Sequence, residues 1–335
     1  MKALLDRLLD GGTLDRAEAR TLMGRLMDGE TSPPLTAALL TVLRVRGETV
    51  DEITGLAEGM RERAAKVTLR RSDAVDTCGT GGDGSGTFNI STAAALAAAG
   101  AGAAVAKHGN RAVSSRSGSA DVLEALGVPV GLEPAEAGRL VDEVGLGFLF
   151  APNHHPAMKH VMPVRRELGV RTVFNILGPL TNPAGVRRQV VGVFRADLCE
   201  TMARVLGALD GERAYVVHGR DGVDEVSLCA PTLVAELRDG AVTSYEVAPE
   251  DFGLARCTAA DLAGGDPAAN ARLIQEILDG AAGPRADAVA LNAGFALAAA
   301  GVADSPADGL TRARAALADG RARAVLEALR ARREA

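Results

Sequence analysis

Cysteine is scarce in this chain, and the few that occur lie far apart. Among 335 residues there are four, Cys78, Cys199, Cys229 and Cys257. No two of them have the C-x-x-C spacing of zinc sites and thioredoxin-like redox motifs. Scattered cysteines in a chain of this length are typical of reduced core residues in a cytosolic protein, so the sequence predicts a cytoplasmic location.

Long apolar segments are missing as well. The first ten residues include Lys2, Asp6, Arg7 and Asp10, which leaves no room for the apolar region of a signal peptide. The longest run without a charge, 84–106, is rich in alanine, glycine, serine and threonine and is interrupted by glycines near its end. It predicts a helix, a turn and a strand rather than a membrane span, so we expect no membrane partner.

Positive charge is not in excess. The chain has 37 lysines and arginines against 43 aspartates and glutamates, for a net charge of −6. General nucleic-acid binders are usually basic, so this balance argues against nucleic acid as a partner, although a local basic pocket could still bind a phosphorylated metabolite. There is also no Ser-His-Asp order, nucleophile elbow or reactive-cysteine context. The site is therefore expected to work by binding and charge rather than through a covalent intermediate.

Glycine, by contrast, is concentrated in one stretch. Five glycines fall within the eight residues 79–86, after an apolar run that begins at Val75 and before a helix that begins near Asn89. Glycines let backbone N–H groups approach a phosphate, and a helix N-terminus adds unpaired donors and a favourable dipole. Strand, loop and helix start together predict an anion-binding cradle. The simpler alternative is a glycine-rich surface turn.

Two common nucleotide-binding motifs do not account for this loop. No Gly-Lys-Ser/Thr follows at the spacing of a Walker A loop. Gly79, Gly81 and Gly84 do match G-x-G-x-x-G, but a dinucleotide site also requires an acid at the end of the next strand. That position is occupied by residues 107–111, Lys-His-Gly-Asn-Arg, which are basic. The second strand end is therefore also predicted to bind an anion.

Two further stretches carry charges suited to a diphosphate. Residues 107–119 place a lysine and two arginines among serines and an asparagine, and cations with hydroxyl groups on a glycine-bearing loop can surround a phosphate. Asp224 and Glu225 are adjacent carboxylates that could bind Mg²⁺ together with phosphate oxygens. In each case the alternative is a solvated polar loop.

The segment 153–166 is harder to assign. His155 and His160 are five residues apart and do not share a helix face, which makes them poor joint metal ligands. Capping and packing are their alternative roles. Arg165 or Arg166 could bind a carboxylate with two parallel hydrogen bonds, although paired arginines on a helix more often lie in solvent.

The order of elements predicts the fold class. Residues 1–66 show only helical patterns, including a capping box at Thr49 and Glu52. From Val75 onward strands and helices alternate, which predicts a mainly parallel sheet covered by helices on both faces. The expected strands are 75–78, 103–106, 147–150, 189–194, 213–217, 225–229 and 232–237. The expected helices in this part are 90–99, 119–126, 134–143, 156–168, 197–208, 267–279, 285–300 and 310–319.

These patterns predict an α/β protein with two domains. The small N-terminal domain is all-helical and comprises residues 1–70. The larger α/β domain comprises residues 71–155 and 188–335 and holds the mostly parallel central sheet, flanked by helices.

Taken together, these stretches resemble the anthranilate phosphoribosyltransferases over nearly the whole chain. The resemblance rests on motifs that occur in order: Gly79-Thr-Gly-Gly-Asp83, Asn89-Ile-Ser-Thr92, Lys107-His-Gly-Asn-Arg-Ala-Val-Ser-Ser115, Gly118-Ser-Ala-Asp-Val-Leu-Glu-Ala-Leu-Gly127, the Arg165 helix, Asn175-Ile-Leu-Gly-Pro-Leu-Thr-Asn-Pro183 and Asp224-Glu225. It implies a fold of the nucleoside phosphorylase/phosphoribosyltransferase type. It also implies Mg²⁺-dependent transfer of the phosphoribosyl group of 5-phosphoribosyl 1-diphosphate (PRPP) to the amine of anthranilate, in tryptophan biosynthesis. A homodimer paired through the helical domain, with a hinge near 170–187, is a further implication. The resemblance implies as well that helices from about 156–187 join the helical domain.

The resemblance also implies roles for individual residues. The residues expected to bind PRPP are Gly79, Gly82, Asp83, Thr87, Asn89, Ile90, Ser91, Thr92, Lys107, His108, Gly109, Asn110, Arg111, Ala112, Val113, Ser114, Ser115 and Ser119. Those expected to bind anthranilate are Gly79, Asn110 and Arg165, and the entry of this substrate would be lined by Pro152, His155 and Met158. The expected magnesium ligands are Ser91, Asp224 and Glu225. Two groups remain candidates for the general base that accepts the proton of the amine: the ortho carboxylate of anthranilate and His108.

Two alternative functions remain at this stage. A pyrimidine nucleoside phosphorylase-like enzyme would share the architecture and the phosphate chemistry, but it would need an inorganic-phosphate site and a nucleobase pocket. A non-catalytic nucleic-acid-binding relative of the same fold would have a basic surface and broken substrate motifs. Here the net charge is negative and the motifs are intact.

Overall fold

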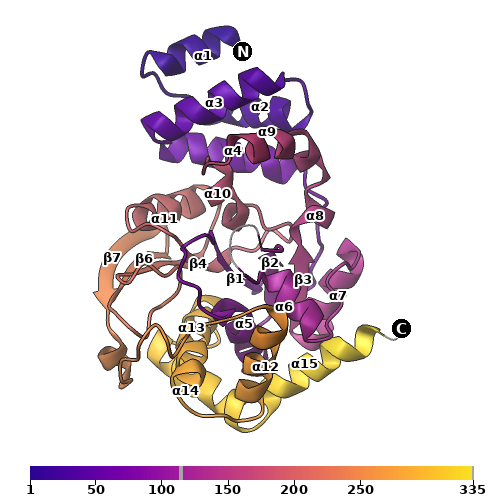
Figure 1. Cartoon of the computed structure of the whole chain (residues 1–335), viewed down its shortest axis with the longest axis vertical. Coiled ribbons are helices and arrows are strands. Elements are labelled where there is room, and N and C mark those ends of the chain that lie inside the picture. The colour runs from indigo at the N-terminus through magenta and orange to yellow at the C-terminus, as the bar shows by residue number, and fades with distance from the viewer. Residues whose placement is uncertain (113–115, 334–335) are drawn as a thin grey trace.

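The N-terminal part of the chain is entirely helical. The computed structural model describes residues 1–112 and 116–333. Its first four helices are α1 (Lys2–Leu9), α2 (Arg16–Met27), α3 (Pro33–Arg46) and α4 (Val50–Glu62). The predicted capping box of Thr49 and Glu52 opens α4. Figure 1 shows these helices stacked at the end of the molecule that carries the N-terminus, with α9 (Met162–Leu168) beside them.

One seven-stranded sheet forms the centre of the remaining chain. The spatial order of its strands is β3-β2-β1-β4-β5-β6-β7. Neighbouring strands from β3 to β5 are parallel, whereas β6 and β7 form an antiparallel hairpin on β5. The prediction of a mostly parallel sheet is therefore confirmed. The strands are β1 (Val75–Gly79), β2 (Val105–Gly109), β3 (Leu146–Phe150), β4 (Arg188–Gly192), β5 (Arg213–Gly219), β6 (Thr232–Arg238) and β7 (Ala241–Val247).

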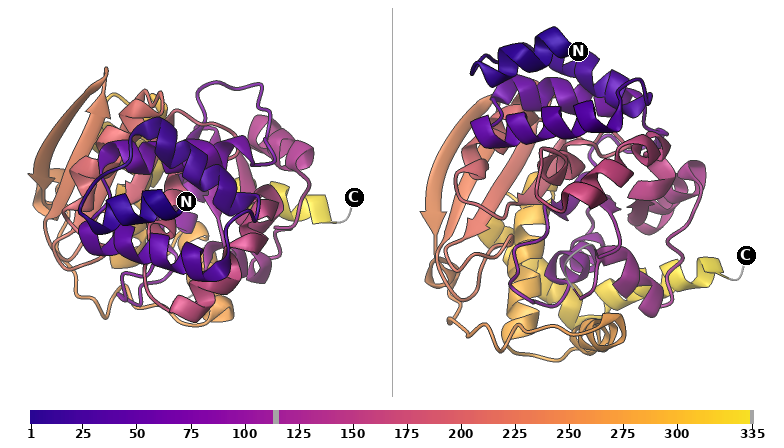
Figure 2. Two further views of the ribbon diagram at one scale, coloured as in Figure 1. Left: turned by 90° about the horizontal axis from the view of Figure 1, so that it is seen from above. Right: turned by 45° about the horizontal axis from the view of Figure 1, so that its top comes forward.

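Helices cover both faces of this sheet because successive strand residues point to opposite sides. Val190 packs into the apolar cluster that contains α5 and α13, whereas Val191 packs into the cluster that contains α11. The second cluster also includes buried residues of α2, α3 and α4, so the N-terminal helices lie against that side of the sheet (Figure 2). The other helices are α5 (Ile90–Gly100), α6 (Ser119–Ala125), α7 (Pro134–Val144), α8 (Ala151–His154), α10 (Phe174–Leu177), α11 (Leu198–Ala208), α12 (Pro267–Leu278), α13 (Pro284–Ala300), α14 (Pro306–Ala318) and α15 (Arg321–Arg330).

Several details differ from the sequence-based expectations. The expected strand 225–229 is wrong: this segment is irregular, because side chains rather than a neighbouring strand bond its backbone, as Asn292 does with Val226. The expected helix 156–168 is divided into a 3₁₀ helix, η1 (Pro156–His160), and α9, which begins after Val161. Strand β7 and helices α8, α10 and α15 were not expected.

No described helix is both long and apolar enough to cross a membrane.

Candidate active site at the carboxyl edge of the sheet

The ends of three neighbouring parallel strands bring the predicted site together. Strands β1, β2 and β4 end at Gly79, Gly109 and Gly192. Because parallel strands present their carboxyl ends at one edge of a sheet, the loops that follow them meet there. The glycine loop 79–86 and the Lys107–Arg111 stretch therefore lie at the same edge, together with Asp224 and Glu225.

Glycines at the ends of β1 and β4 let the Asp224 segment approach these strands closely. The Gly81 N–H donates to Asp224 Oδ2 at 2.8 Å. A Cβ atom at Gly79 would lie 2.6 Å from the same oxygen, and one at Gly192 would lie 1.6 Å from the carbonyl oxygen of Asp224. Both positions therefore require glycine for this close approach. Within the loop, Gly82 has a φ of 71°, a left-handed conformation that glycine adopts without strain.

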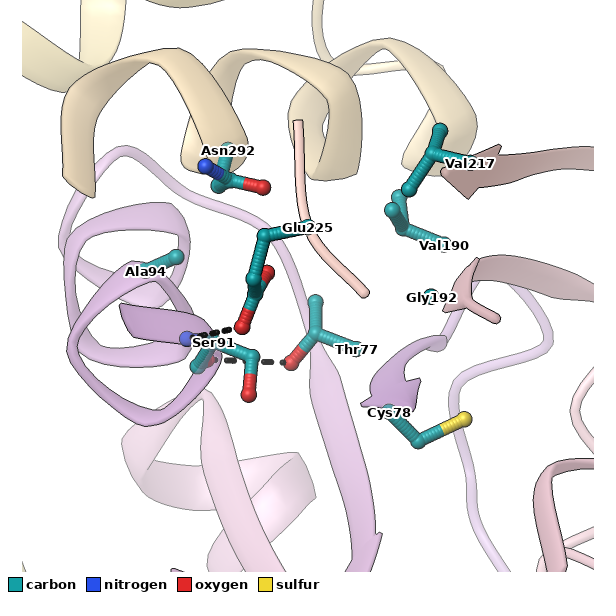
Figure 3. Close-up of a pocket in the computed structure, with 9 residues that line it drawn as sticks. All are labelled: Thr77, Cys78, Ser91, Ala94, Val190, Gly192, Val217, Glu225 and Asn292. Carbon is teal, nitrogen blue, oxygen red and sulfur yellow. Dashed lines mark hydrogen bonds between the residues drawn. The ribbon is translucent and has the colours of Figure 1, made fainter. Parts of the chain in front are cut away.

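Glu225 contacts the N-terminus of α5. The Ser91 N–H, in the first turn of this helix, donates to Glu225 Oε1 at 3.0 Å. Figure 3 shows this bond and the hydrogen bond from Thr77 Oγ1 to the Ser91 carbonyl oxygen, 3.5 Å long, inside a small pocket. The pocket is lined by Thr77, Cys78, Ser91, Ala94, Val190, Gly192, Val217, Glu225 and Asn292. A helix N-terminus stabilises a carboxylate as it would a phosphate, so this position suits an anion in general.

Negative charge accumulates beside the glycine loop. Asp83 Oδ2 accepts a hydrogen bond from the Asp224 N–H at 3.3 Å. Burial raises the pKa of Asp224, and the neighbouring Asp83 carboxylate raises it further. Burial and then Asp224 likewise raise the pKa of Glu225. A cation would neutralise this excess charge, which fits the predicted magnesium site.

The carboxylates alone do not enclose a metal ion. Among residues 1–112 and 116–333, no group of three or more histidine, cysteine or acidic side chains has the arrangement of a metal site. Mg²⁺ commonly takes only one or two carboxylates and fills its remaining positions with water and substrate phosphate oxygens. The residues present therefore fit a magnesium ion that is bound together with a phosphorylated substrate.

Lys107 is the buried cation of the site. Its side chain is 3% exposed, and its ammonium group donates to the Thr77 carbonyl oxygen and lies 3.4 Å from Ser91 Oγ. Burial lowers the pKa of this lysine, whereas the nearby Asp76 carboxylate opposes the shift. The ammonium group therefore lies beside the residues predicted to bind PRPP at the start of α5.

Arg111 is directed differently from Lys107. Its guanidinium bonds Glu124 at 2.6 Å and Asp121 at 3.1 Å, and it lies over the Phe150 ring. The Ala112 N–H donates to Asp121 Oδ2 at 2.9 Å. In this structure the arginine side chain is thus paired with α6 and not with the glycine loop. The predicted residues Val113, Ser114 and Ser115 lie outside the described residues.

The remaining predicted PRPP residues surround the start of α5. Asn89 Nδ2 donates to the Ser117 carbonyl oxygen at 3.1 Å, and Ser119 Oγ donates to the Asn110 carbonyl oxygen at 3.3 Å. Ile90 is 3% exposed and belongs to the apolar core, so only its backbone can serve a ligand. Thr87 pairs with Ala263 in an isolated bridge at the far end of the loop. Thr92 has a buried hydroxyl oxygen without a hydrogen-bond partner among the described residues.

His108 is held as a neutral imidazole. Its Nδ1 lies 3.2 Å from the carbonyl oxygen of Gly178, so Nδ1 carries the proton and donates. Its Nε2 is buried and has no partner in the part of the chain that the structure describes. Burial, followed by the nearby His155, lowers the pKa of His108 to about 3. A base with so low a pKa accepts a proton poorly at neutral pH.

Arg165 is a half-buried cation without a carboxylate partner among the described residues. Its guanidinium lies over the Phe174 ring, 5.2 Å from the centroid, and its one hydrogen bond within residues 1–112 and 116–333 is to the sulfur of Met162, at 3.7 Å. Burial lowers the pKa of this arginine. Such a guanidinium is free to bind the carboxylate of a substrate.

Two features of the site were not found from the sequence. Asp76 is fully buried and accepts hydrogen bonds from the backbone N–H of His108 at 3.1 Å and from Asn182 Nδ2 at 2.8 Å. An acid inside an apolar strand was the signal that could have revealed it. Arg171 bonds the carbonyl oxygen of Gly82 and lies 4.1 Å from the centroid of the Phe194 ring, so it supports the glycine loop from outside.

Comparisons with known proteins agree with this arrangement. Residues 2–64 match the helical bundle domain of the glycosyl transferase family, and residues 71–323 match its a/b domain. The chain is 54% identical over 330 residues to an anthranilate phosphoribosyltransferase of Symbiobacterium thermophilum, covering 98% of this chain and 97% of the relative. It is 56% identical over 325 residues to one of Xanthomonas axonopodis pv. citri, covering 97% and 94%.

Solved structures give the same result. The crystal structure of anthranilate phosphoribosyltransferase from Thermus thermophilus is similar with a TM-score of 0.94, 49% identity and 99% coverage of both chains. The enzyme from Saccharomyces cerevisiae in complex with PRPP and Mg is similar with a TM-score of 0.88 and 28% identity, covering 96% of this chain and 94% of that one.

Proposed function

We infer that this chain is an anthranilate phosphoribosyltransferase, because it belongs to that family of glycosyl transferases. It transfers the phosphoribosyl group of PRPP to the amine of anthranilate and yields N-(5-phosphoribosyl)anthranilate and diphosphate, in tryptophan biosynthesis. One observation carries the proposal. The glycine loop, the N-terminus of α5, Lys107 and the Asp224–Glu225 pair meet at one sheet edge, where a diphosphate needs donors and cations.

The proposed PRPP site uses backbone donors first. The amides of the glycine loop and of Ser91 now bond Asp224 and Glu225, and they are the groups that a diphosphate would engage. Lys107 places its positive charge beside the same helix end. Asn89, Thr92 and the 107–119 stretch would complete the site as expected from the sequence.

We propose Mg²⁺ as the metal, held by Ser91, Asp224 and Glu225 together with the diphosphate oxygens of PRPP. When bound, the ion supplies Lewis-acid stabilisation of the charge on the departing diphosphate. The similar yeast enzyme has been solved with PRPP and Mg, which supports the choice of Mg²⁺ as the metal. The raised pKa values of Asp224 and Glu225 support it as well, because burial and the neighbouring carboxylates disfavour their negative charge, which a bound cation would neutralise.

Anthranilate is proposed to bind at the helical side of the glycine loop. Arg165 would hold its carboxylate, because the guanidinium has no acidic partner in the described chain. Asn110 and Gly79 would contact the rest of the ring system, and Pro152, His155 and Met158 would line the entry.

The chemical step is proposed to be displacement at C1 of the ribose through an oxocarbenium-like transition state. The amine of anthranilate attacks from the face opposite to the diphosphate, and Arg165 and Asn110 orient it. Orientation of this kind lowers the entropic part of the activation barrier. The glycine-loop amides stabilise the negative charge of the leaving group. The low pKa of His108 favours the ortho carboxylate of anthranilate as the proton acceptor.

The larger organisation is proposed as follows. Residues 1–70 with about 156–187 form the helical domain, and 71–155 with 188–335 form the α/β domain; contacts of α9 with α3 and of α10 with α4 support this division. The chain would act in the cytoplasm as a homodimer that pairs through the helical domain. Leu9 and Val45, which are 64% and 81% exposed, are apolar side chains of that domain available for pairing.

One measurement tests the function. Purified protein is mixed with anthranilate, PRPP and Mg²⁺, and the fluorescence of anthranilate is followed. Its loss should require both PRPP and Mg²⁺. If the signal persists while calorimetry still detects PRPP binding, another acceptor must be sought; phosphorolysis of thymidine or uridine would instead reveal a nucleoside phosphorylase.

A further inference from the structure

Two of the four cysteines are outside the core and lie next to each other. Cys78 and Cys199 are buried, as expected from the sequence, whereas Cys229 and Cys257 are only half-buried. The Sγ atoms of Cys229 and Cys257 are 3.4 Å apart. The backbones of the two segments are joined beside them, because the Cys257 N–H donates to the Leu228 carbonyl oxygen at 3.1 Å. A disulfide has an S–S distance of about 2.05 Å, so a small approach of the side chains would suffice to form one.

The segment of Cys229 follows the proposed magnesium ligands directly. Cys229 lies four residues after Glu225 in the chain. Between them, the Val226 N–H donates to Asn292 Oδ1 at 2.9 Å and the Ser227 N–H donates to Thr232 Oγ1 at 2.9 Å. The segment is therefore bonded to α13 through Asn292 and to β6 through Thr232. Because these bonds limit how it can bend, a displacement of Cys229 would also displace the backbone near Glu225.

The segment of Cys257 supports the far end of the glycine loop. Downstream of Cys257, the Leu262 carbonyl oxygen accepts from the Phe88 N–H at 3.0 Å, and the Gly264 N–H donates to the Gly86 carbonyl oxygen at 2.8 Å. A bond between the two sulfurs would thus join the segment after the carboxylates to the segment that holds residues 86–88.

We propose that Cys229 and Cys257 are an oxidation site, at which hydrogen peroxide forms a reversible disulfide that weakens the binding of PRPP. The effect on PRPP rests on the function proposed above. Mg²⁺ and the diphosphate would contact both the segment of Asp224 and Glu225 and the glycine loop, and a disulfide between Cys229 and Cys257 would restrain the movement of these two segments relative to each other.

The chemistry balances with peroxide as the oxidant. Burial raises the pKa of both thiols, but the hydrogen bond from the Cys257 thiol opposes this rise at Cys229, which makes Cys229 the sulfur that ionises first. The Cys229 thiolate attacks one oxygen of peroxide and the O–O bond breaks, which gives a sulfenic acid and a hydroxide ion; the hydroxide takes up the proton that the thiol released and becomes water. The Cys257 sulfur then attacks the Cys229 sulfur and releases a second water. Two thiols lose two protons and two electrons, and one peroxide becomes two waters.

The test combines mapping with binding. Wild-type protein is treated with hydrogen peroxide, and non-reducing peptide mapping should find Cys229 linked to Cys257 within one chain, while Cys78 and Cys199 stay reduced. Calorimetry with Mg²⁺ should show the Kd for PRPP raised about threefold or more after oxidation, with recovery after dithiothreitol. Cys229→Ser and Cys257→Ser are the matched controls, and their PRPP affinity should not respond to peroxide.

Several outcomes would overturn the proposal. The oxidation site is refuted if peptide mapping finds no Cys229–Cys257 link, or finds it only between chains. The effect on PRPP is refuted if the link forms and the Kd is unchanged, or if the serine variants lose affinity equally. Failure of the reduced wild-type protein to bind PRPP would instead refute the proposed function, while the peptide map would still decide whether the two sulfurs react.

Discussion

The contact between Gly192 and the Asp224 segment leads to a sharp prediction. A Cβ atom at Gly192 would lie 1.6 Å from the Asp224 carbonyl oxygen, and real Cβ atoms essentially never come closer than 3.0 Å to such a neighbour. Gly192 is held in β4 by register with Gly79 on one side and Val217 on the other. In a Gly192→Ala variant the sheet therefore keeps its place, and the Asp224 segment has to retreat by more than about 1 Å.

The size of the effect follows from the hydrogen bonds that this retreat disturbs. The bond from Gly81 to Asp224 and the bond from Ser91 to Glu225 have donor–acceptor distances of 2.8 and 3.0 Å, so neither survives such a shift unchanged. Misplacement on the order of 1 Å in an active site lowers activity on the order of 100-fold. Crowding of a packed site lowers the free energy of unfolding by about 1–3 kcal/mol, which a folded protein of this size tolerates.

The assay is the PRPP-dependent loss of anthranilate fluorescence, measured across a range of Mg²⁺ concentrations. Gly192→Ala should need more Mg²⁺ and should turn over on the order of 100-fold more slowly, with circular dichroism close to that of the wild type. Gly131→Ala is the control, because a Cβ atom there meets nothing within 4 Å. If Gly192→Ala keeps the wild-type Mg²⁺ dependence and turnover, the carboxylates are not held where the reasoning places them.

Three other predictions concern the same region. Asp224→Asn combined with Glu225→Gln should weaken Mg²⁺-supported PRPP binding by calorimetry, and unchanged binding at limiting Mg²⁺ would remove both residues from the metal site. Arg165→Ala should raise the KM for anthranilate about tenfold or more through loss of a charged hydrogen bond, and an equal rise in the KM for PRPP would contradict a role limited to anthranilate. Burial is the main reason that the pKa of His155 is lowered from 6.5 to about 4, so below pH 6.5 the unfolded chain binds a proton there that the folded chain does not. The free energy of unfolding therefore falls as the pH falls from 6.5 toward 4. In denaturant titrations between pH 6.5 and 4.5, His155→Asn should reduce the pH slope of the unfolding free energy by about 1.4 kcal/mol per pH unit, and an unaltered slope would show that His155 is not the group responsible.

Local signals in the sequence were sufficient for much of the fold. The glycine loop was recognisable because glycine has a special backbone role there, and the cap at Thr49 is a side-chain hydrogen bond between near neighbours. Strand β7 was missed because its burial alternates weakly at the edge of the sheet. The Asp239-Gly240 turn, in which both residues have positive φ, was the available signal for its hairpin with β6.

The missed parts of the site depend on contacts between distant segments. The segment 225–229 has the composition of a strand, but Asn292, more than sixty residues away, bonds both backbone groups of Val226. From the sequence alone Arg171 would be predicted to lie in solvent, because its partner Gly82 is 89 residues away in the chain. Such pairs leave no periodic pattern, so a single sequence cannot reveal them.

The buried polar groups below the site explain how the helical part of the chain is tied to the strand ends. Buried amide and carboxylate groups are costly unless they are hydrogen-bonded, and here they are paired: Asn182 donates to Asp76 and to the Ala106 carbonyl oxygen, both at 2.8 Å. Gln189 donates to the Pro179 carbonyl oxygen at 2.8 Å, and Arg61 of α4 donates to the Leu180 carbonyl oxygen at 2.6 Å. The segment 178–183 is thus bonded to the sheet from below and to the helices from above. Because Asp76 also holds the His108 N–H, a movement of α4 against the sheet would act on this network at the base of the Lys107–Arg111 loop.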